Sequence, residues 1–306
     1  MKALLLLPLI ATPFAFTNAA EDESTCSSAK ATATSTKDIV QTAVDAGQFK
    51  TLATALGAAN LVGALQGEGP FTVFAPTDEA FAKLPKGTLE TLLDEKNKGL
   101  LTSILTYHVV AGEMPAKKVL GSKYLTTLNG QRIDVMANDS GAFIDGAQIR
   151  STDIECSNGI IHVIDEVILP ASDDIVTTAV NAGSFKTLAA ALQAAGLVEA
   201  LKGEGPFTVF APTDEAFAAL GKETISSLLE PGNKQKLIDI LKFHVVSGRV
   251  YGDQALEAKT FATLQGGKLN AKKNGEGLMI GDANVVTGDL ETSNGVIHVI
   301  DKVLLP

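Results

Sequence analysis

The chain has 306 residues, 45% of them hydrophobic and 20% charged, and its formal net charge is −10. This length suits two domains of ordinary size, each able to bury a core of its own. Its basic residues are scattered, with nothing denser than the pairs Lys117-Lys118 and Lys272-Lys273. Because nucleic acid binding needs a basic face that displaces counterions from phosphate, the charge argues against a nucleic acid partner.

Residues 1–19 have the features of a secretory signal peptide. Lys2 provides a basic start, the stretch 3–16 is apolar, and small residues lead up to Ala19. We expect cleavage after Ala19, with Ala20 as the next choice. The apolar stretch is short and interrupted by two prolines, so it is a poor membrane span. The sequence therefore predicts a secreted, extracellular protein, or a periplasmic one if the host is Gram-negative.

Residues 20–36 are rich in Ser, Thr and Ala and show no apolar period, which predicts a flexible tail. This tail carries Cys26, and the second of the chain's two cysteines is Cys156. An oxidising export route favours a Cys26–Cys156 disulfide that ties the tail to the end of the first domain. The alternative is two unrelated thiols.

The sequence repeats itself with a constant offset of 136 positions. A period of this length indicates a duplicated domain rather than a solenoid turn. The predicted domains span residues 37–170 and 173–306, called copy 1 and copy 2 below, and with almost no linker between them we expect them to touch. The repeated segments are Asp38-Ile39-Val40 with Asp174-Ile175-Val176, 67–82 with 203–218, 108–110 with 244–246, and 157–165 with 293–301.

In chain order, Asp38 is the expected cap of a first helix, and short helical pieces follow it. Residues 71–75 form an expected strand that stops at Pro76, after which Thr77 caps another helix. Leu100 to Tyr107 is again helical by pattern. The remainder is mostly strand: Asn129-Gly130 predicts a hairpin turn, and the apolar run after Asn158-Gly159 predicts a strand buried on both faces. Helices before strands favour an α+β fold.

These segments resemble the fasciclin domain family. FTVFAPTDEAF at 71–81 is similar to its first signature segment, YHVV at 107–110 to its central one, and SNGIIHVID at 157–165 to its closing strand. All three occur in order in both halves. The resemblance implies two tandem β-wedges of about seven strands, each flanked by several helices. It also implies a role in adhesion to cells or matrix.

In animal members of the family, integrin binding has been attached to a Tyr-His pair with neighbouring branched apolar residues. The matching residues in copy 1 are Tyr107, His108, Val109 and Val110. In copy 2 the pair is Phe243-His244, which lacks the hydroxyl group. The resemblance makes these six residues the candidate adhesion residues.

The chain has four histidines, two per copy, in the signature segments. His162 and His298 lie inside apolar strands, where burial keeps an imidazole neutral, so we interpret them as structural. Zinc needs three or four ligands, often closely spaced, and no such pattern occurs. A nucleophile elbow, a phosphate loop and a Cys-x-x-Cys motif are also missing. We therefore predict no metal site, cofactor, catalytic residue or enzymatic activity.

Asn138-Asp139-Ser140 has the pattern of an N-glycosylation acceptor, with Asn138 in an expected loop. The leading hypothesis is a non-enzymatic adhesion or matrix module, monomeric or weakly dimeric, that binds a cell-surface or matrix protein or a glycan. Two alternatives remain. One is a carrier that holds a small ligand in an apolar cleft between wedge and helices, and the other is an extracellular hydrolase.

Overall fold

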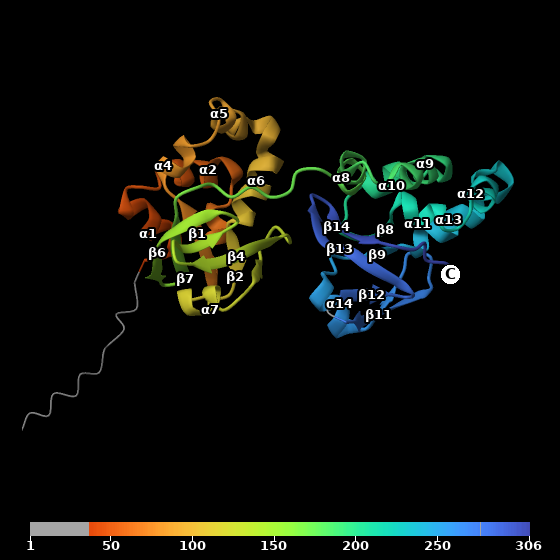
Figure 1. The fold of residues 1–306 in the computed structure, drawn as a ribbon. Helices are drawn as coiled ribbons and strands as arrows, with labels where there is room; N and C mark the ends of the chain where they lie inside the picture. The colour runs from red at the N-terminus through yellow and green to blue at the C-terminus, as the bar shows by residue number, and fades with distance from the viewer. Residues whose placement is uncertain (1–36, 276) are drawn as a thin grey trace, which may run out of the picture. The chain divides into compact units, whose positions relative to one another are not determined.

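The computed structural model describes residues 37–275 and 277–306, so the predicted signal peptide, the whole predicted tail and Cys26 lie outside the described residues. Both copies show the same succession of elements (Figure 1). Copy 1 consists of α1 (Ile39–Ala46), α2 (Lys50–Ala59), α3 (Val62–Leu65), β1 (Phe71–Pro76), α4 (Asp78–Ala82), α5 (Thr88–Leu93), η1 (Glu95–Asn97), α6 (Lys98–Tyr107), β2 (Val109–Ala111), α7 (Ala116–Leu120), β3 (Tyr124–Thr126), β4 (Arg132–Asn138), β5 (Gly141–Ile144), β6 (Ala147–Cys156) and β7 (Gly159–Ile164). Copy 2 consists of α8 (Ile175–Ala182), α9 (Lys186–Ala195), α10 (Val198–Lys202), β8 (Phe207–Pro212), α11 (Asp214–Ala218), α12 (Lys222–Leu229), η2 (Pro231–Asn233), α13 (Lys234–Phe243), β9 (Val245–Ser247), α14 (Gly252–Ala258), β10 (Thr260–Ala262), β11 (Lys268–Asn274), β12 (Gly277–Ile280), β13 (Ala283–Thr292) and β14 (Gly295–Ile300).

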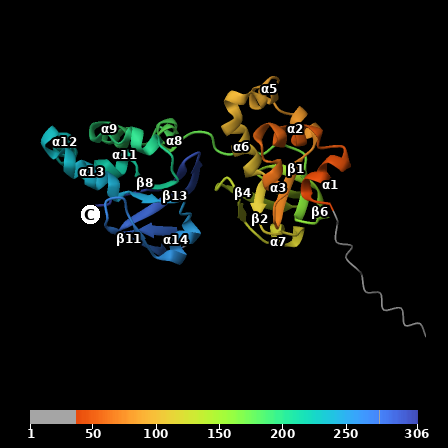
Figure 2. The same cartoon turned by 180° about the vertical axis from the view of Figure 1, so that it is seen from behind.

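Each copy contains one seven-stranded sheet, in the order β2-β1-β7-β6-β5-β4-β3 and β10-β11-β12-β13-β14-β8-β9. The sheets are mixed: β1 runs parallel to β7 and β8 parallel to β14, while the other neighbours are antiparallel. Helices α8 to α13 gather along one side of the copy 2 sheet, and α14 lies beside β11 (Figures 1 and 2). The structure thus confirms the expected α+β architecture, with two copies of a seven-stranded sheet flanked by helices.

Side-chain caps begin the helices where the sequence predicts them. The Asp38 carboxylate accepts a hydrogen bond from the Gln41 N–H at 2.7 Å, and the Thr77 hydroxyl accepts one from the Ala80 N–H at 3.2 Å. Each bond satisfies a backbone donor that the first turn of a helix leaves without a partner. Asp78, next to the cap, accepts a bond from a donor at the start of a different helix, α2. One short segment therefore fixes two helix starts.

The core of copy 1 is divided between two apolar clusters. The first lies between helices α1 to α6 and strands β1 and β7. The second is enclosed by the curved sheet itself and by α7, with Phe74, Ile133 and Ile164 fully buried. Strand β7 separates the two, which explains why all of its residues are buried, as its apolar sequence predicts.

Two boundaries differ from the sequence pattern. His108 ends helix α6 as its C-cap, and strand β2 begins one residue later, at Val109. Strand β7 ends at Ile164 although the apolar pattern continues to Leu169. The Asp165 side chain turns back to accept a hydrogen bond from the Gln148 N–H at 2.8 Å, while the Asp165 N–H donates to the Gln148 carbonyl at 3.2 Å. Among residues 37–275 and 277–306, no helix has both the length and the apolar character that a membrane crossing requires.

Candidate functional site

The central signature segment, where the resemblance puts the adhesion residues, is buried in both copies. Tyr107 and His108 are 5% and 2% exposed, and Phe243 and His244 are 7% and 2% exposed. Val109 and Val110 are equally buried, on the short strand β2. In this fold the six side chains face the inside of their domains, so they present no surface to a partner.

The Tyr107 hydroxyl has a structural role. It donates to Asp145 Oδ2 at 2.5 Å and also lies 2.9 Å from the Arg132 carbonyl oxygen. Burial and the neighbouring Asp145 carboxylate raise the pKa of Tyr107. Asp145 has a φ of 45° in the turn between β5 and β6, and its copy 2 equivalent is Gly281. The two copies therefore differ at both partners of this hydrogen bond: copy 1 has tyrosine with aspartate, and copy 2 has phenylalanine with glycine.

His108 and His244 use both ring nitrogens inside the domain. Each Nδ1–H donates to the carbonyl four residues earlier, at 2.8 Å, in the helix that the histidine ends. Each Nε2 accepts from a backbone N–H, that of Ile168 at 3.3 Å and that of Leu304 at 2.9 Å. Complete burial lowers the pKa of both histidines to about 4. Both rings are neutral near pH 7 and fasten the segment after the last strand to the helix end.

His162 and His298 tie strands to loops. His162 Nε2 lies 2.8 Å from the Met114 carbonyl, and its Nδ1 accepts from the Asp153 N–H at 3.4 Å. Its ring stacks on Phe74 with centroids 5.4 Å apart, and His298 has the same set of contacts in copy 2. Burial lowers the pKa of both. Among the described residues, no three His, Cys, Asp or Glu side chains are grouped so that they could hold a metal ion.

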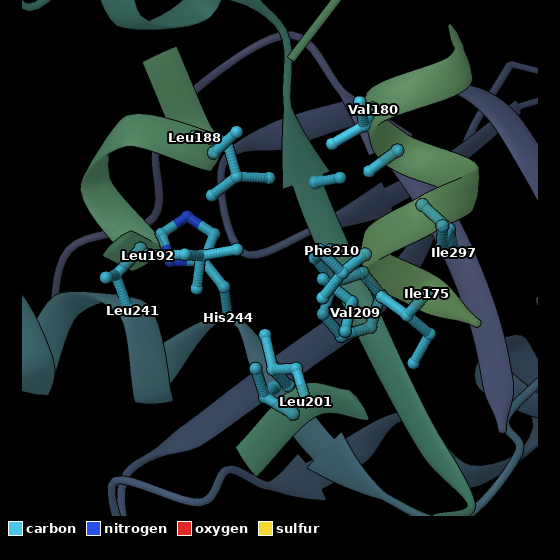
Figure 3. Close-up of a pocket in the computed structure, with 15 residues that line it drawn as sticks. Ile175, Val180, Leu188, Leu192, Leu201, Val209, Phe210, Leu241, His244 and Ile297 are labelled. Atoms are coloured by element: carbon cyan, nitrogen blue, oxygen red, sulfur yellow. The ribbon is translucent and has the colours of Figure 1, made fainter. Parts of the chain in front are cut away.

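An apolar cavity lies next to His244, between α8, α9, α13 and strand β8 (Figure 3). Ile175 and Val180 of α8 face Leu188 and Leu192 of α9 across it. Its volume is about 30 Å³, and the matching cavity of copy 1 has about 20 Å³. A drug-sized ligand needs a pocket of roughly 300–1,000 Å³. The small-ligand carrier hypothesis therefore requires α8 to move away from α9.

Three pairs of large apolar side chains are exposed at equivalent positions of both copies. One pair lies on the first helix of each copy, one in the turn after the third strand, and one near the end of each domain. Single exposed apolar side chains are common on protein surfaces, so it is their recurrence at equivalent positions of both copies that makes them candidate contact residues. Comparing the two copies finds these matching apolar residues in the sequence. Only their exposed fractions in the structure show that they lie outside the core. The pairs are Val44 and Val180 (56% and 58% exposed), Leu128 and Leu264 (48% and 46%), and Leu169 and Leu305 (54% and 59%).

Two predicted modification sites have different surroundings. Cys156 is buried at the end of β6 and has no disulfide partner among the described residues, while Cys26 lies outside them. The Ser157 N–H donates to the Lys37 carbonyl at 2.9 Å, so the chain enters copy 1 next to this cysteine.

Asn138 is exposed at the end of β4, where its side-chain oxygen accepts from the Ser140 N–H. The turn leaves the amide nitrogen of Asn138 on the protein surface.

The comparisons with known proteins agree on one family. The family model of the fasciclin domain matches residues 47–170 and 183–306. The transforming growth factor-beta-induced protein ig-h3 of Sus scrofa is 31% identical over 245 residues, 79% of this chain and 35% of that protein. Protein sll1483 of Synechocystis is 47% identical over 144 residues, 47% of this chain and 79% of that protein. Human periostin is 29% identical over 261 residues, 84% of this chain and 30% of its own length.

A solved structure of a FAS1 domain pair from the insect cell adhesion molecule fasciclin I has a TM-score of 0.43 at 18% identity, covering 84% of this chain and 96% of that one. The chain spans about a third of the length of the ig-h3 and periostin relatives. The family model matches both halves, each with the signature segments in the places described above. This chain belongs to the fasciclin domain family and contains two tandem copies of the domain.

Proposed function

We propose that this chain is a secreted adhesion or matrix module that binds a cell-surface or matrix protein or a glycan and carries out no chemistry. Membership of the fasciclin family supports an adhesion-type module. The observation that carries the proposal is the state of the polar signature side chains. His108, His162, His244 and His298 all bond to backbone groups of their own domain, which leaves recognition to the outer surface.

The exposed apolar pairs are the best-supported contact residues on that surface. Apolar side chains that lose their water on binding contribute to affinity, whereas exposed rim charges mainly affect association rate. A pair in tandem copies also offers two attachment points, which raises avidity when a partner carries repeated sites. We therefore expect binding to depend on Val44 with Val180, on Leu128 with Leu264, or on Leu169 with Leu305.

Adhesion of cells to wells coated with the mature chain tests this function, with a glycan array as the second arm. The variants replace one pair at a time by serine, and the control replaces the exposed Lys86 and Lys222 by serine. We expect at least one pair to reduce adhesion or glycan binding while the control does not. Equal binding by the wild type and all three paired variants would contradict a role for these residues, and no binding by the wild type to any cell or glycan would contradict adhesion itself.

Replacing Tyr107 or His108 is a poor test of adhesion, because both side chains are buried and their loss affects folding first. Any variant at these positions therefore needs a stability measurement beside the binding assay. The export part of the proposal has its own test. The mature N-terminus in the extracellular fraction, read by mass spectrometry, should be Ala20 or Glu21.

A further inference from the structure

One arginine at the start of β4 makes contacts that cross from copy 1 to copy 2. The Arg132 guanidinium donates two hydrogen bonds to the Asp253 carboxylate, at 2.9 and 3.2 Å. It also lies between two tyrosine rings, 3.9 Å from the centre of Tyr124 and 3.7 Å from the centre of Tyr251. Its side chain is only 9% exposed. A planar cation between two rings and a two-point carboxylate contact is a geometry that arginine provides and lysine does not.

The copy 2 side of this contact is held in place by its own hydrogen bonds. The Tyr251 hydroxyl donates to Glu291 Oε1 at 2.5 Å, and the same oxygen accepts from the backbone N–H of Arg132 at 2.9 Å. Arg249 holds the other carboxylate oxygen at 3.1 Å and donates to backbone carbonyls of the β13–β14 turn. Tyr251 is 2% exposed. Residues of copy 2 therefore position the Glu291 carboxylate that accepts the hydrogen bond from copy 1.

The two copies differ at these positions more sharply than in their signature segments. Where copy 1 has Arg132 and Tyr124, copy 2 has lysine and threonine. Where copy 2 has Arg249, Tyr251 and Asp253, copy 1 has glutamate, proline and lysine, so two charges are reversed. Glu291 alone has the same residue type in both copies. The equivalent pairs are Arg132 and Lys268, Tyr124 and Thr260, Arg249 and Glu113, Tyr251 and Pro115, Asp253 and Lys117, and Glu291 and Glu155.

We propose that Arg132 docks copy 1 onto a copy 2 receptor formed by Tyr251, Asp253 and Glu291, so that the two domains act as one binding unit in a fixed order. Residues 37–275 and 277–306 fall within a single compact unit by their contacts, in agreement with this. Copy 2 has a lysine where copy 1 has Arg132, and copy 1 lacks the tyrosine and aspartate of the receptor. This contact therefore joins a copy 1 to a copy 2 and does not join two domains of the same type. The docking itself does not depend on the proposed function. Its consequence does, because docking would keep the two adhesion surfaces at a constant spacing.

We expect this contact to determine how the two copies are arranged more than how stable the protein is. The Arg132 Nε has no acceptor among the described residues, which adds to the cost of removing the guanidinium from water. Only one partner of this ion pair is buried, since the Asp253 side chain is 46% exposed, and the net stability that such a pair adds is small. Because the guanidinium is largely removed from water, we expect the contact to persist at physiological salt, where exposed pairs are screened.

Backbone ¹⁵N relaxation of the full mature chain tests the docking. In the wild type, amides of both copies should share one rotational correlation time. In Arg132→Ala and in Asp253→Ala, the copies should show separate and shorter times, and small-angle scattering should report a larger radius of gyration. Arg132→Lys, which installs the copy 2 residue, should be intermediate. Lys268→Ala, the equivalent position of copy 2, is the matched control and should behave as the wild type.

Separate correlation times in the wild type would overturn the proposal, and so would a single time retained in both alanine variants. If Arg132→Ala lowers the stability of copy 1, Asp253→Ala decides the question, because that side chain is 46% exposed and its loss leaves the copy 1 core intact. Failure of the adhesion assay leaves this result unaffected, since relaxation measures docking and not partner binding.

Discussion

Acidification from pH 7 to pH 5 should destabilise both copies, because each one folds around a histidine that must stay neutral. His108 and His244 are fully buried and donate Nδ1–H while accepting at Nε2, an arrangement that a protonated ring cannot keep. The folded state therefore binds its proton less readily than the unfolded chain. Stability falls as the pH drops below the unfolded pKa and continues to fall until the folded pKa is reached.

The size of the effect follows from the two pKa values. With a pKa lowered from 6.5 to about 4 in the folded state, linkage gives a loss of about 2 kcal/mol per histidine between pH 7 and pH 5. His162 and His298 shift in the same direction and add to the loss. Asp78 and Asp214 have lowered pKa values, so the stability they contribute is lost only at still lower pH. Burial raises the pKa of Asp145 and Glu291, and their protonation opposes part of this loss, so the histidine share is read from the difference between wild type and histidine variants.

Urea unfolding followed by NMR measures this in each copy separately, through resolved amide signals of copy 1 and copy 2. The variant His108→Gln keeps an amide donor for the Ile104 carbonyl and an oxygen acceptor for the Ile168 N–H, but it does not titrate. We expect it to remove about 2 kcal/mol of the pH-dependent loss from copy 1 and none from copy 2. His244→Gln should do the converse. An equal pH dependence in wild type and His108→Gln would refute the assignment of the effect to these rings.

Three further expectations concern the buried polar contacts and the cysteines. Tyr107→Phe should destabilise copy 1 by about 1.5–3 kcal/mol in the same urea assay, because Asp145 loses a hydrogen-bond donor. Adding Asp145→Gly, which installs the copy 2 residue, should recover part of that loss. Additive effects of the two changes would contradict the coupling. Asn294→Ala should destabilise copy 2 by about 2 kcal/mol or more, since its side chain bonds the Ile175 N–H and the carbonyls of Leu201 and Gly203 at the end of α10, and intact hydrogen-exchange protection of α8 would contradict this role. If Cys26 and Cys156 pair after export, the intact mass of the secreted protein should lie two hydrogens below the reduced value, and alkylation of both thiols without prior reduction would exclude the bridge.

The sequence predicts the fold well where the signals are local. Asp38 and Thr77 cap the helices that their residue types indicate, and the Asn129-Gly130 turn joins β3 to β4 with a left-handed glycine at φ 89°. The seven strands and the duplicated arrangement follow the resemblance to the fasciclin family. The caps and the turn depend on residues close together in the chain, so their pattern suffices, whereas the pairing of Phe71 in β1 with Gly159 in β7 is distant in sequence and is reached only through the resemblance.

The candidate site is harder to predict because burial depends on distant contacts. Tyr107-His108 looks like an accessible motif in the sequence, yet the hydroxyl of Tyr107 reaches Asp145, thirty-eight residues further along. The Arg132–Asp253 contact joins residues 121 positions apart and follows from no local pattern. Its one sequence signal is a mismatch between the copies, arginine against lysine and aspartate against lysine.

The longest segment that the two copies share letter for letter serves folding in this chain. Asp78 and Asp214 belong to the segment that the copies share letter for letter, and their carboxylates bond the N–H of Thr51 and Thr187 at 2.8 and 2.7 Å. These bonds hold two helix starts of one domain together, so the shared segment describes the fold and identifies no partner. Residues that folding does not fix are free to differ, and Arg132, Tyr251 and Asp253 are of that kind. What distinguishes this tandem from two separate fasciclin domains should therefore be found where its copies disagree.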